Sequence, residues 1–455
     1  MNQVKTLNSF SMLLSDIAEI LSAKHVGENI QVKGISTDTR TISGGELFVA
    51  LKGPNFDGHN FINEALAKGA VACLVQQPVD AEHFVITNDT HQALGLLAKA
   101  WRQKFKNPVI AITGSNGKTT VKEMIASIIN QQQSAMATHG NLNNDIGVPL
   151  TLFRLNKNYD AAVIEMGANH SGEISYLTNI ALPDIAVITN IGAAHLEGFG
   201  SIENTAKAKS EIFEGLSENG FAVINTDDAF SEYFKDITTQ YNVLSFGIKN
   251  KADVMCEWES GIEGSVLNVM TPVGQCKVNL KLLGRHNIMN ALAAIAASIA
   301  AEISLEQIVK GLEELKPVNG RLQIKRGLNN SRVIDDTYNA NPTSLHAALN
   351  VLRDFSGKRF LALGDMGELG NHAADLHVDA GIYAKQNGVD SLFSYGKLAE
   401  KAAKEFGDNG FCYDKHEDMI DAIRDELTQD VTLLVKGSRS MHMENVVNAL
   451  TMVEG

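Results

Sequence analysis

Residues 114–120, which read GSNGKTT, combine the residue types that bind a phosphate chain. Backbone N–H groups of such a glycine-bracketed loop point at an anion, and a lysine such as Lys118 neutralises the outer phosphates. The hydroxyl of Thr119 is a suitable ligand for Mg²⁺. The common form of this motif has glycine at position 112, where this chain has Ile112. We still predict a nucleotide site here rather than an ordinary strand-to-helix turn with a solvated lysine.

A carboxylate and an imidazole follow the neighbouring predicted strands. Glu165 ends the apolar run AAVIEM, and His195 comes just after IAVITNI. In open parallel sheets ligands bind beyond the carboxyl ends of the strands, so both side chains could reach a metal ion held on the phosphates. Taken singly, Glu165 has an ordinary interpretation as a loop carboxylate and His195 as a satisfied polar side chain. Their shared position relative to the loop favours a metal site.

Other polar clusters stay ambiguous when only the residues are considered. The segment NTAKAKSEIFEGL predicts a helix carrying Lys207 and Lys209, and the pattern alone indicates solvated charges. The segments GRHNIMNALAA and RVIDDTYNANPTS place His, Asn and Asp at element ends, where they contact ligands or cap helices. The residues by themselves therefore indicate a magnesium-dependent user of ATP with a substrate domain on either side.

The elements that must position these groups alternate between strands and helices. The runs VIAIT, AAVIEM and IAVITNI are typical of strands buried on both faces of a parallel sheet. After the loop, apolar residues recur on one face of a predicted helix, at Val121, Met124, Ile125, Ile128 and Ile129. The segment SVLNVMTPVGQCKVNLKLLG predicts extra strands, and the alanine-rich NIMNALAAIAASIAAE predicts a helix.

The predicted fold class is α/β with three domains. Residues 1–86 contain short apolar runs broken by Gly-Gly, Gly-Pro and Asp-Gly turn signals, and residues 87–316 contain the phosphate loop. Proline and glycine in LKPVNGR mark a break, after which residues 317–455 hold a second strand and helix series. Its predicted strands are SRVIDD, RFLALGD, DSLFSYG and TLLVKGS.

Composition excludes several classes of protein. A net charge of −14 argues against a nucleic-acid or anionic-membrane binder. No run approaches the roughly 18 apolar residues that a membrane helix needs, and the start lacks the layout of a signal peptide. The four cysteines have no metal-ligand spacing and indicate reduced, mostly packed thiols: Cys73, Cys256, Cys276 and Cys412. We expect a cytoplasmic protein.

The loop TGSNGKTT resembles that of the Mur ligases, which build peptidoglycan precursors and are related to folylpolyglutamate synthase. The family's loop has the form T-G-x-N-G-K-[ST]-[ST], so Ile112 is ordinary in this variant. Similar segments run through the whole chain: STDTR, GELFVALKG, FDGHNF, GNLNNDIGVPLT, EMGANHSGEI, NIGAAHLEGFGS, AKAKSEIF, GRHNIMNALAA, DDTYNANPTS, LGDMGELG and VKGSRSMHME. GNLNNDIGVPLT and DDTYNANP favour the dipeptide-adding branch, and the D-N-P-R motif of the diaminopimelate-adding branch is not found.

The resemblance implies a fold and a reaction. The three domains would be a small N-terminal α/β substrate domain, a central P-loop parallel-sheet ATPase domain and a C-terminal Rossmann-like α/β domain. ATP would phosphorylate the terminal carboxylate of UDP-N-acetylmuramoyl-tripeptide, and the amine of D-alanyl-D-alanine would attack the acyl phosphate. Most of this work is charge neutralisation, which calls for two Mg²⁺ ions and lysine rather than a protein nucleophile. The third residue of the tripeptide stays open, and we expect a monomer.

The resemblance also implies roles for individual residues near the phosphates. Lys118 would steady the outer phosphates, while Thr119 and Glu165 would bind the first Mg²⁺. His195 would bind the second ion together with a carbamate formed on Lys209, for which Lys207 is the competing candidate. The loop residues expected to hold ATP are Gly114, Ser115, Asn116, Gly117, Lys118, Thr119 and Thr120.

Other matches concern the rest of the nucleotide and the acceptor. Arg321 would approach the γ-phosphate when the third domain closes. The residues matched to the adenine are Asn287 and Asn290, and Asp336 is matched to the ribose. The residues matched to the UDP end of the acceptor are Thr37, Asp38 and Arg40, and those matched to its muramoyl-peptide are Asn143 and Asn144.

Two alternatives remain open. Another Mur-type or folylpolyglutamate-type ligase would share the ATP chemistry and differ in its acceptor or its amine. A P-loop protein that hydrolyses nucleotide to switch conformation would turn over ATP without an acceptor. The switch leaves Glu165, His195 and Lys209 unexplained.

Overall fold

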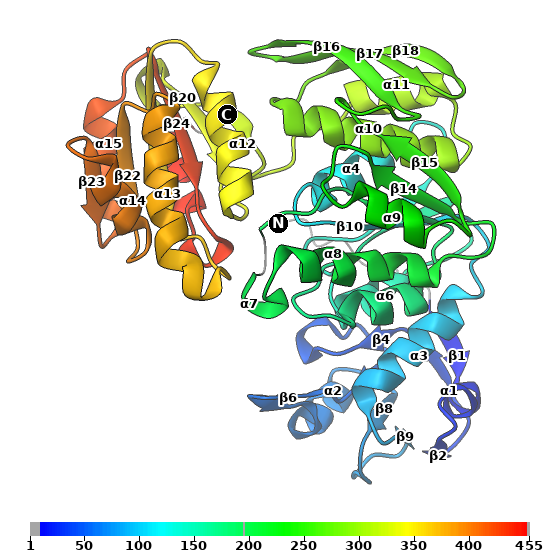
Figure 1. The fold of residues 1–455 in the computed structure, drawn as a ribbon. Coiled ribbons are helices and arrows are strands. Elements are labelled where there is room, and N and C mark those ends of the chain that lie inside the picture. Colours follow the sequence, from blue (N-terminus) through cyan, green and yellow to red (C-terminus); the bar gives the residue numbers. More distant parts are fainter. Residues whose placement is uncertain (1–9, 194–195, 453–455) are drawn as a thin grey trace.

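The three predicted buried strands belong to a six-stranded parallel sheet at the centre of the molecule (Figure 1). The computed structural model describes residues 10–193 and 196–452. The strand order is β11-β12-β10-β13-β14-β15, and every residue of β10, β12 and β13 is buried. The strands are β10 (Val109–Thr113), β11 (Ala135–Ala137), β12 (Ala161–Glu165), β13 (Ile185–Ile188), β14 (Phe221–Asn225) and β15 (Asn242–Phe246).

Helices cover both faces of the central sheet, as parallel sheets require. Alternate residues of β10 face two separate cores: Ile110 packs with α4, α10 and α11, whereas Ala111 packs with α3, α5 and α6. These helices are α3 (Thr90–Arg102), α4 (Lys118–Ile129), α5 (Gly147–Leu152), α6 (Glu173–Ala181), α10 (Arg285–Ala300) and α11 (Leu305–Glu313). The remaining helices of this region are α7 (Leu196–Phe199), α8 (Ile202–Ser210) and α9 (Ser231–Ile237).

The predicted extra strands form a three-stranded antiparallel sheet beside α10 and α11. Two were predicted, β17 (Gly264–Thr271) and β18 (Gly274–Leu280), and the structure adds β16 (Met255–Gly261). The helix predicted over NTAKAKSEIFEGL is only partly correct. The α-helix α8 ends at Ser210, and a 3-10 helix, η3 (Glu211–Gly215), continues the segment.

The N-terminal region forms a five-stranded mixed sheet of order β2-β9-β8-β5-β4 below the central sheet in Figure 1. One set of buried residues of this region, which includes Phe10, shares a core with α3 and one face of the central sheet. A second set, which includes Phe48 and Cys73, forms a separate core on the other face of the five-stranded sheet. Its strands are β1 (Ser11–Leu13), β2 (Lys24–Val26), β3 (Gln31–Lys33), β4 (Ile35–Ser36), β5 (Leu47–Val49), β6 (Lys52–Gly53), β7 (Phe56–Asp57), β8 (Ala72–Val75) and β9 (Phe84–Ile86). Its helices are α1 (Leu14–Ile20), η1 (Thr39–Thr41), η2 (Gly58–Phe61) and α2 (Ile62–Ala67).

The C-terminal region forms a second six-stranded sheet, of order β19-β20-β24-β21-β22-β23, with helices on both faces. All neighbours are parallel except β19, which pairs antiparallel with β20. The strands are β19 (Gln323–Arg326), β20 (Arg332–Asp336), β21 (Lys358–Gly364), β22 (Ser391–Tyr395), β23 (Gly410–Tyr413) and β24 (Val431–Lys436). The helices are η4 (Leu328–Asn330), α12 (Pro342–Arg353), η5 (Gly370–His372), α13 (Ala373–Gln386), α14 (Ala399–Phe406), α15 (His416–Glu426), η6 (Arg439–Met441) and α16 (Glu444–Leu450).

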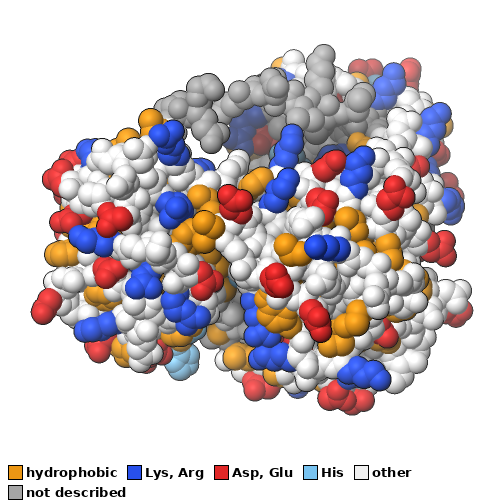
Figure 2. All heavy atoms as spheres, turned by 90° about the horizontal axis from the view of Figure 1, so that it is seen from above, with side chains coloured by type: hydrophobic (Ala, Val, Ile, Leu, Met, Phe, Trp, Pro, Cys, Tyr) orange, Lys and Arg blue, Asp and Glu red, His pale blue; other side chains and the backbone are white. Residues whose placement is uncertain are grey.

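Seen from above, the C-terminal region and the central region appear as two lobes that meet along a groove (Figure 2). A hydrogen bond of 2.9 Å from Asn341 Nδ2 to Asn116 Oδ1 joins α12 to the phosphate loop across this boundary. Within the described residues, no helix is long and apolar enough to cross a membrane. Of the four thiols, those of Cys73 and Cys256 are buried, Cys276 is half-buried and Cys412 is exposed.

Candidate active site

The phosphate loop has the backbone that its two glycines allow. Gly114 has φ of 148° and Gly117 has φ of 84°, both in the left-handed region that favours glycine. A Cβ at Gly114 would lie 1.9 Å from Thr189 Oγ1, and a Cβ at Gly117 would lie 2.3 Å from Asn290 Oδ1. Helix α4 begins immediately afterwards, at Lys118. The first N–H groups of this helix lack intrahelical partners, so the loop presents donors and the positive end of the helix dipole to an anion.

Lys118 lies inside the site with its ammonium directed back over the loop. Its Nζ donates a 2.7 Å hydrogen bond to the carbonyl of Gly114. Burial lowers the pKa of Lys118, and the opposing charge of Glu165 raises it in part. The charge of the Lys118 ammonium is therefore poorly screened by solvent, which strengthens its attraction to a phosphate group.

Glu165, the last residue of β12, has a buried carboxylate in which one oxygen lacks a hydrogen-bond partner. Its Oε1 accepts a 2.9 Å hydrogen bond from Asn143 Nδ2, and its backbone N–H donates to Thr138 Oγ1. Its Oε2 is buried and has no hydrogen-bond partner. A buried carboxylate oxygen without a partner destabilises the fold unless a bound group interacts with it. A divalent cation is suited to bind such an oxygen.

The structure contradicts the prediction, made from the sequence pattern alone, that Lys209 is a solvated charge. The side chain is fully buried rather than solvated, whereas Lys207 is exposed. Its Nζ has no hydrogen-bond partner and lies 5.5 Å from the ring centroid of Phe199. Burial, with a smaller effect from the Lys118 charge, holds the pKa of Lys209 well below its ordinary value. This lowered pKa favours the uncharged amine, the form of lysine that reacts with carbon dioxide.

Arg321 reaches the phosphate loop from the start of the C-terminal region. Its Nη2 donates a 3.4 Å hydrogen bond to Thr119 Oγ1, and its guanidinium lies 4.0 Å from the ring centroid of Tyr338. Stacking on an aromatic face fixes a planar guanidinium without using its donors. In this structure Arg321 is therefore already beside the loop. His195, the other predicted metal ligand, lies outside the described residues.

The two asparagines matched to the adenine form one small network on α10. Asn290 Nδ2 donates to Asn287 Oδ1 at 3.0 Å, and Asn287 Nδ2 donates to the carbonyl of Leu283. The neighbouring His286 is half-buried, and desolvation lowers its pKa to about 4. His286 is therefore neutral in this part of the site.

Asp336 already has two protein partners. Its Oδ1 accepts from the backbone N–H of Leu322, and its Oδ2 lies 2.5 Å from Lys436 Nζ. Lys436 is fully buried, and it also donates to the carbonyl of Asn339. Sequence reasoning missed Lys436, although a lysine at the end of the apolar run TLLVKGS was an available signal. This pair holds Leu322, and hence its neighbour Arg321, against the end of β20.

Asn143 and Asn144 lie in the same loop, and their side chains make different hydrogen bonds. Asn143 contacts Glu165 as described, and Asn144 Oδ1 accepts from the N–H of Gly147 at the start of α5. Both residues line one cavity of about 640 Å³ between the central and C-terminal regions. Most of the residues predicted for ATP and the first metal ion line it too: Ser115, Asn116, Gly117, Lys118, Thr119, Thr120, Glu165, Asn287, Asn290, Arg321 and Asp336. Lys209 is not among the described residues that line it.

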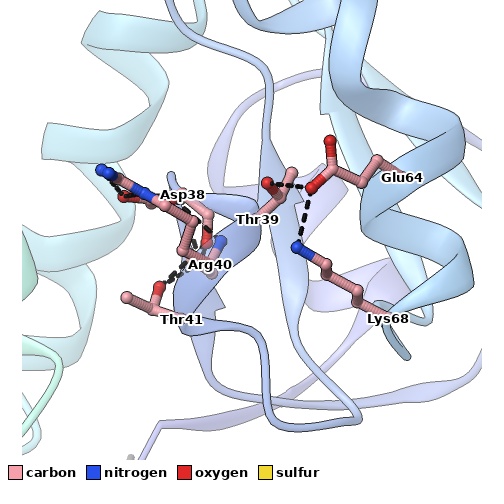
Figure 3. Close-up of polar contacts among 7 residues, drawn as sticks. Asp38, Thr39, Arg40, Thr41, Glu64 and Lys68 are labelled. Carbon is pink, nitrogen blue, oxygen red and sulfur yellow. Dashed lines mark hydrogen bonds and ion pairs between the residues drawn. The ribbon is translucent and has the colours of Figure 1, made fainter.

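The motif matched to the UDP end lies apart from this cavity, in the N-terminal region (Figure 3). Arg40 Nη2 pairs with Asp38 Oδ2 at 2.6 Å, and Asp38 Oδ1 also caps the short helix η1. The buried Thr39 donates to Glu64, which pairs with Lys68. Thr37, the first residue of the motif, is half-buried. The Arg40 side chain is mostly exposed and is oriented by Asp38.

An ion pair ties the asparagine loop to the connecting helix α3. His91 Nε2 lies 2.8 Å from Asp145 Oδ2, and the His91 ring stacks on Tyr176 of α6. The hydrogen bond to Asp145 raises the pKa of His91, and the same bond lowers the pKa of Asp145. The pair therefore joins three elements around the loop that carries Asn143.

We predict a pH-dependent contribution of this pair to stability. A raised pKa means that the His91 contribution is complete below its ordinary pKa of 6.5 and is lost as pH rises through the raised value. The lowered pKa of Asp145 has the opposite sign, so its contribution is lost only in acid. His91→Gln should cost up to about 1 kcal/mol near pH 6, because both side chains are partly exposed, and much less near pH 9. Urea unfolding at both pH values measures this, and an equal loss at both would contradict the ion-pair explanation.

The fold and site are those of an amide-forming ATP ligase, and the chain belongs to the Mur ligase family. Its family models match as the Mur ligase family catalytic domain over residues 31–132, the Mur ligase middle domain over 112–298 and the Mur ligase glutamate ligase domain over 320–439. The chain is 43% identical to the UDP-N-acetylmuramoyl-tripeptide–D-alanyl-D-alanine ligase of Escherichia coli, covering 97% of this chain and 98% of that one.

Solved structures agree with this relationship. The crystal structure of MurF from Acinetobacter baumannii superposes with a TM-score of 0.92 at 36% identity, covering 97% of this chain and 99% of that one. MurF ligase from Thermotoga maritima in complex with ADP gives a TM-score of 0.82 at 29% identity, covering 91% and 96%. The predicted three-domain α/β class, with parallel sheets in the central and C-terminal regions, is confirmed.

Proposed function

We propose that this chain is an ATP-dependent ligase that adds D-alanyl-D-alanine to UDP-N-acetylmuramoyl-tripeptide through an acyl phosphate. The observation that carries the proposal is the single cavity that gathers the phosphate loop, Glu165 and Arg321. The near full-length Escherichia coli relative bears the name of that activity. The functional domains would be residues 1–86 for the acceptor nucleotide and 87–316 for ATP, with residues 317–455 as the Rossmann-like domain that supplies Arg321.

The residues present fit Mg²⁺ as the ion that accompanies ATP. Glu165 has an unpartnered buried oxygen, and Thr119 supplies a hydroxyl at the loop. No group of three or more His, Cys, Asp and Glu side chains gathers within residues 10–193 and 196–452, so phosphate oxygens and water would complete the ligand set. We assign the first ion to Thr119 and Glu165, and a second to His195 and the Lys209 carbamate. When bound, Mg²⁺ neutralises charge on the transferred phosphoryl group.

The protein's own groups act by placement and charge. Lys118 and the loop N–H groups hold the outer phosphates, while Arg321 approaches them from the C-terminal region. A carboxylate oxygen of the tripeptide forms a bond to the γ-phosphorus, and ADP leaves. The dipeptide nitrogen then bonds to the acyl carbon, loses a proton, and displaces phosphate. Two anions must meet in the first step, so the cations contribute most of the rate enhancement.

The remaining assignments concern binding. Asn287 and Asn290 would face the adenine, and Asp336 the ribose. Thr37, Asp38 and Arg40 would bind the UDP end, while Asn143 and Asn144 would line the path of the muramoyl-peptide. We also propose that the enzyme acts as a monomer in the cytoplasm, because one chain supplies every region of the site and ATP is its energy source.

Phosphate release from ATP and Mg²⁺ tests the function directly. We expect release only when UDP-N-acetylmuramoyl-tripeptide and D-alanyl-D-alanine are both present, with the pentapeptide product visible by mass. Release that needs the nucleotide sugar but ignores the dipeptide would indicate another Mur-type or folylpolyglutamate-type ligase. Turnover of ATP with neither substrate present would indicate a nucleotide switch. Lysine-ended and diaminopimelate-ended tripeptides, compared in the same assay, would identify the third residue.

A further inference from the structure

A buried lysine that the proposed chemistry does not use lies one turn beyond the phosphate loop. Lys122 is 1% exposed, and its Nζ donates a 2.8 Å hydrogen bond to the backbone carbonyl of Thr138. Its ammonium also pairs with the carboxylate of Glu123, whose side chain is partly exposed, at 2.8 Å. Lysine is seldom fully buried, because its ammonium loses hydration that few protein contacts replace. The burial of Lys122 therefore needs an explanation.

The partner of Lys122 is the residue that holds Glu165. Thr138 directly follows β11, an edge strand that pairs only with β12. The Thr138 hydroxyl accepts a 2.9 Å hydrogen bond from the Glu165 N–H, and the Thr138 N–H donates to the carbonyl of Val163. Lys122 thus secures the free end of an edge strand at the point where that strand contacts the metal carboxylate.

The two protein groups assigned to the first Mg²⁺ come from different elements. Thr119 belongs to α4, and Glu165 ends β12. Lys122 lies on the same helix as Thr119, three residues later, so its bond to Thr138 connects α4 with the backbone that carries Glu165. Asn143 restrains the carboxylate from the other side through Oε1, which leaves Oε2 as the oxygen for the ion.

We infer that Lys122 is a positioning residue of the divalent-cation site, setting the place of Glu165 relative to Thr119 through Thr138. This inference rests on the proposed assignment of Glu165 to Mg²⁺. Lys122 touches neither substrate nor ion. Its contribution is to hold two ligand-bearing elements in register, as outer contacts of metal ligands commonly do.

Binding of Mn²⁺ to the full chain in the presence of ADP, followed by electron paramagnetic resonance, tests the inference without requiring turnover. Lys122→Met keeps the apolar stem and removes the ammonium, and we expect it to weaken Mn²⁺ binding about 10-fold. ADP affinity measured by calorimetry without divalent ions should stay within about twofold, because the loop donors are untouched. Lys122→Arg retains an N–H donor and should recover part of the Mn²⁺ affinity.

Matched variants separate positioning from general stability. Glu123→Gln removes the exposed partner of the same ammonium and should change Mn²⁺ affinity less than about twofold. Thr138→Val removes the hydroxyl that receives Glu165, so it should weaken Mn²⁺ binding as Lys122→Met does. Because both act through one chain of contacts, the double variant should lose less than the sum of the two.

The outcomes distinguish this inference from the proposed function. If Glu165→Gln leaves Mn²⁺ binding unchanged, the metal assignment itself is wrong. If Glu165→Gln weakens binding while Lys122→Met lowers only the melting temperature, Lys122 is merely structural and the inference is overturned. If Lys122→Met does not fold, unchanged Mn²⁺ affinity in Thr138→Val overturns the inference equally well.

Discussion

Replacing Lys118 with methionine is expected to lower kcat by about 100- to 1,000-fold, the usual cost of removing one preorganised group that stabilises a transition-state charge. The ammonium of Lys118 lies over the phosphate loop, and its pKa is lowered by burial, so its charge acts in a poorly screened environment. Methionine preserves the stem of the side chain and removes only the charge and its donors.

Phosphate release under saturating substrates measures this loss. Lys118→Arg should not restore activity, because a planar guanidinium does not fit a loop that surrounds a compact ammonium. Lys106→Met is the matched control: this lysine is exposed, donates to the carbonyl of Gln103, and should be dispensable. Activity of Lys118→Met within tenfold of the native value would contradict the phosphate assignment.

Replacing Lys209 with methionine is expected to abolish most activity and to raise stability at the same time. The buried Nζ of Lys209 has no hydrogen-bond partner, and its pKa is far below the ordinary value. A lysine with a lowered folded-state pKa destabilises the fold below its ordinary pKa, because the unfolded chain binds the proton more tightly. An apolar side chain of similar length removes that cost, as is common when a functional polar group is lost from a buried site.

The activity loss follows from the carbamate proposal. In this step the neutral amine nitrogen forms a bond to the carbon of carbon dioxide. The electron pair of one carbon–oxygen π bond moves to that oxygen, and the nitrogen then loses a proton. We expect kcat of Lys209→Met to fall about 100-fold, in line with the loss of a metal-site group. Native activity should also fall when bicarbonate is removed and return when it is added.

Two controls make this prediction specific. Lys207→Met alters an exposed lysine two positions earlier and should change neither activity nor melting temperature measurably. Labelled bicarbonate should produce a carbamate signal in the native chain that Lys209→Met lacks. A fully active Lys209→Met variant, or a melting temperature below that of the native chain in chelator and without bicarbonate, would contradict this account.

Local patterns were sufficient for the elements and for the loop. The runs VIAIT, AAVIEM and IAVITNI became β10, β12 and β13, because continuous apolar runs suit strands covered on both faces. The glycines of TGSNGKTT adopt positive φ just before α4 begins. Such features depend on residues close together in the chain, and the sequence therefore determined both the class of fold and the backbone of the glycine loop.

Features that join distant segments were decided only by the tertiary structure. The sequence pattern alone indicated a solvated charge at Lys209, yet the packing of α8 buries this side chain completely. The hydrogen bond from Lys122 to Thr138 joins residues 16 positions apart. The contact of Arg321 with Thr119 spans 202 positions. The burial of a side chain and its long-range partners depend on how whole elements pack. The sequence therefore determined which ionisable side chains are present. Packing determined which of these side chains contact each other, which lack a partner, and how their pKa values shift.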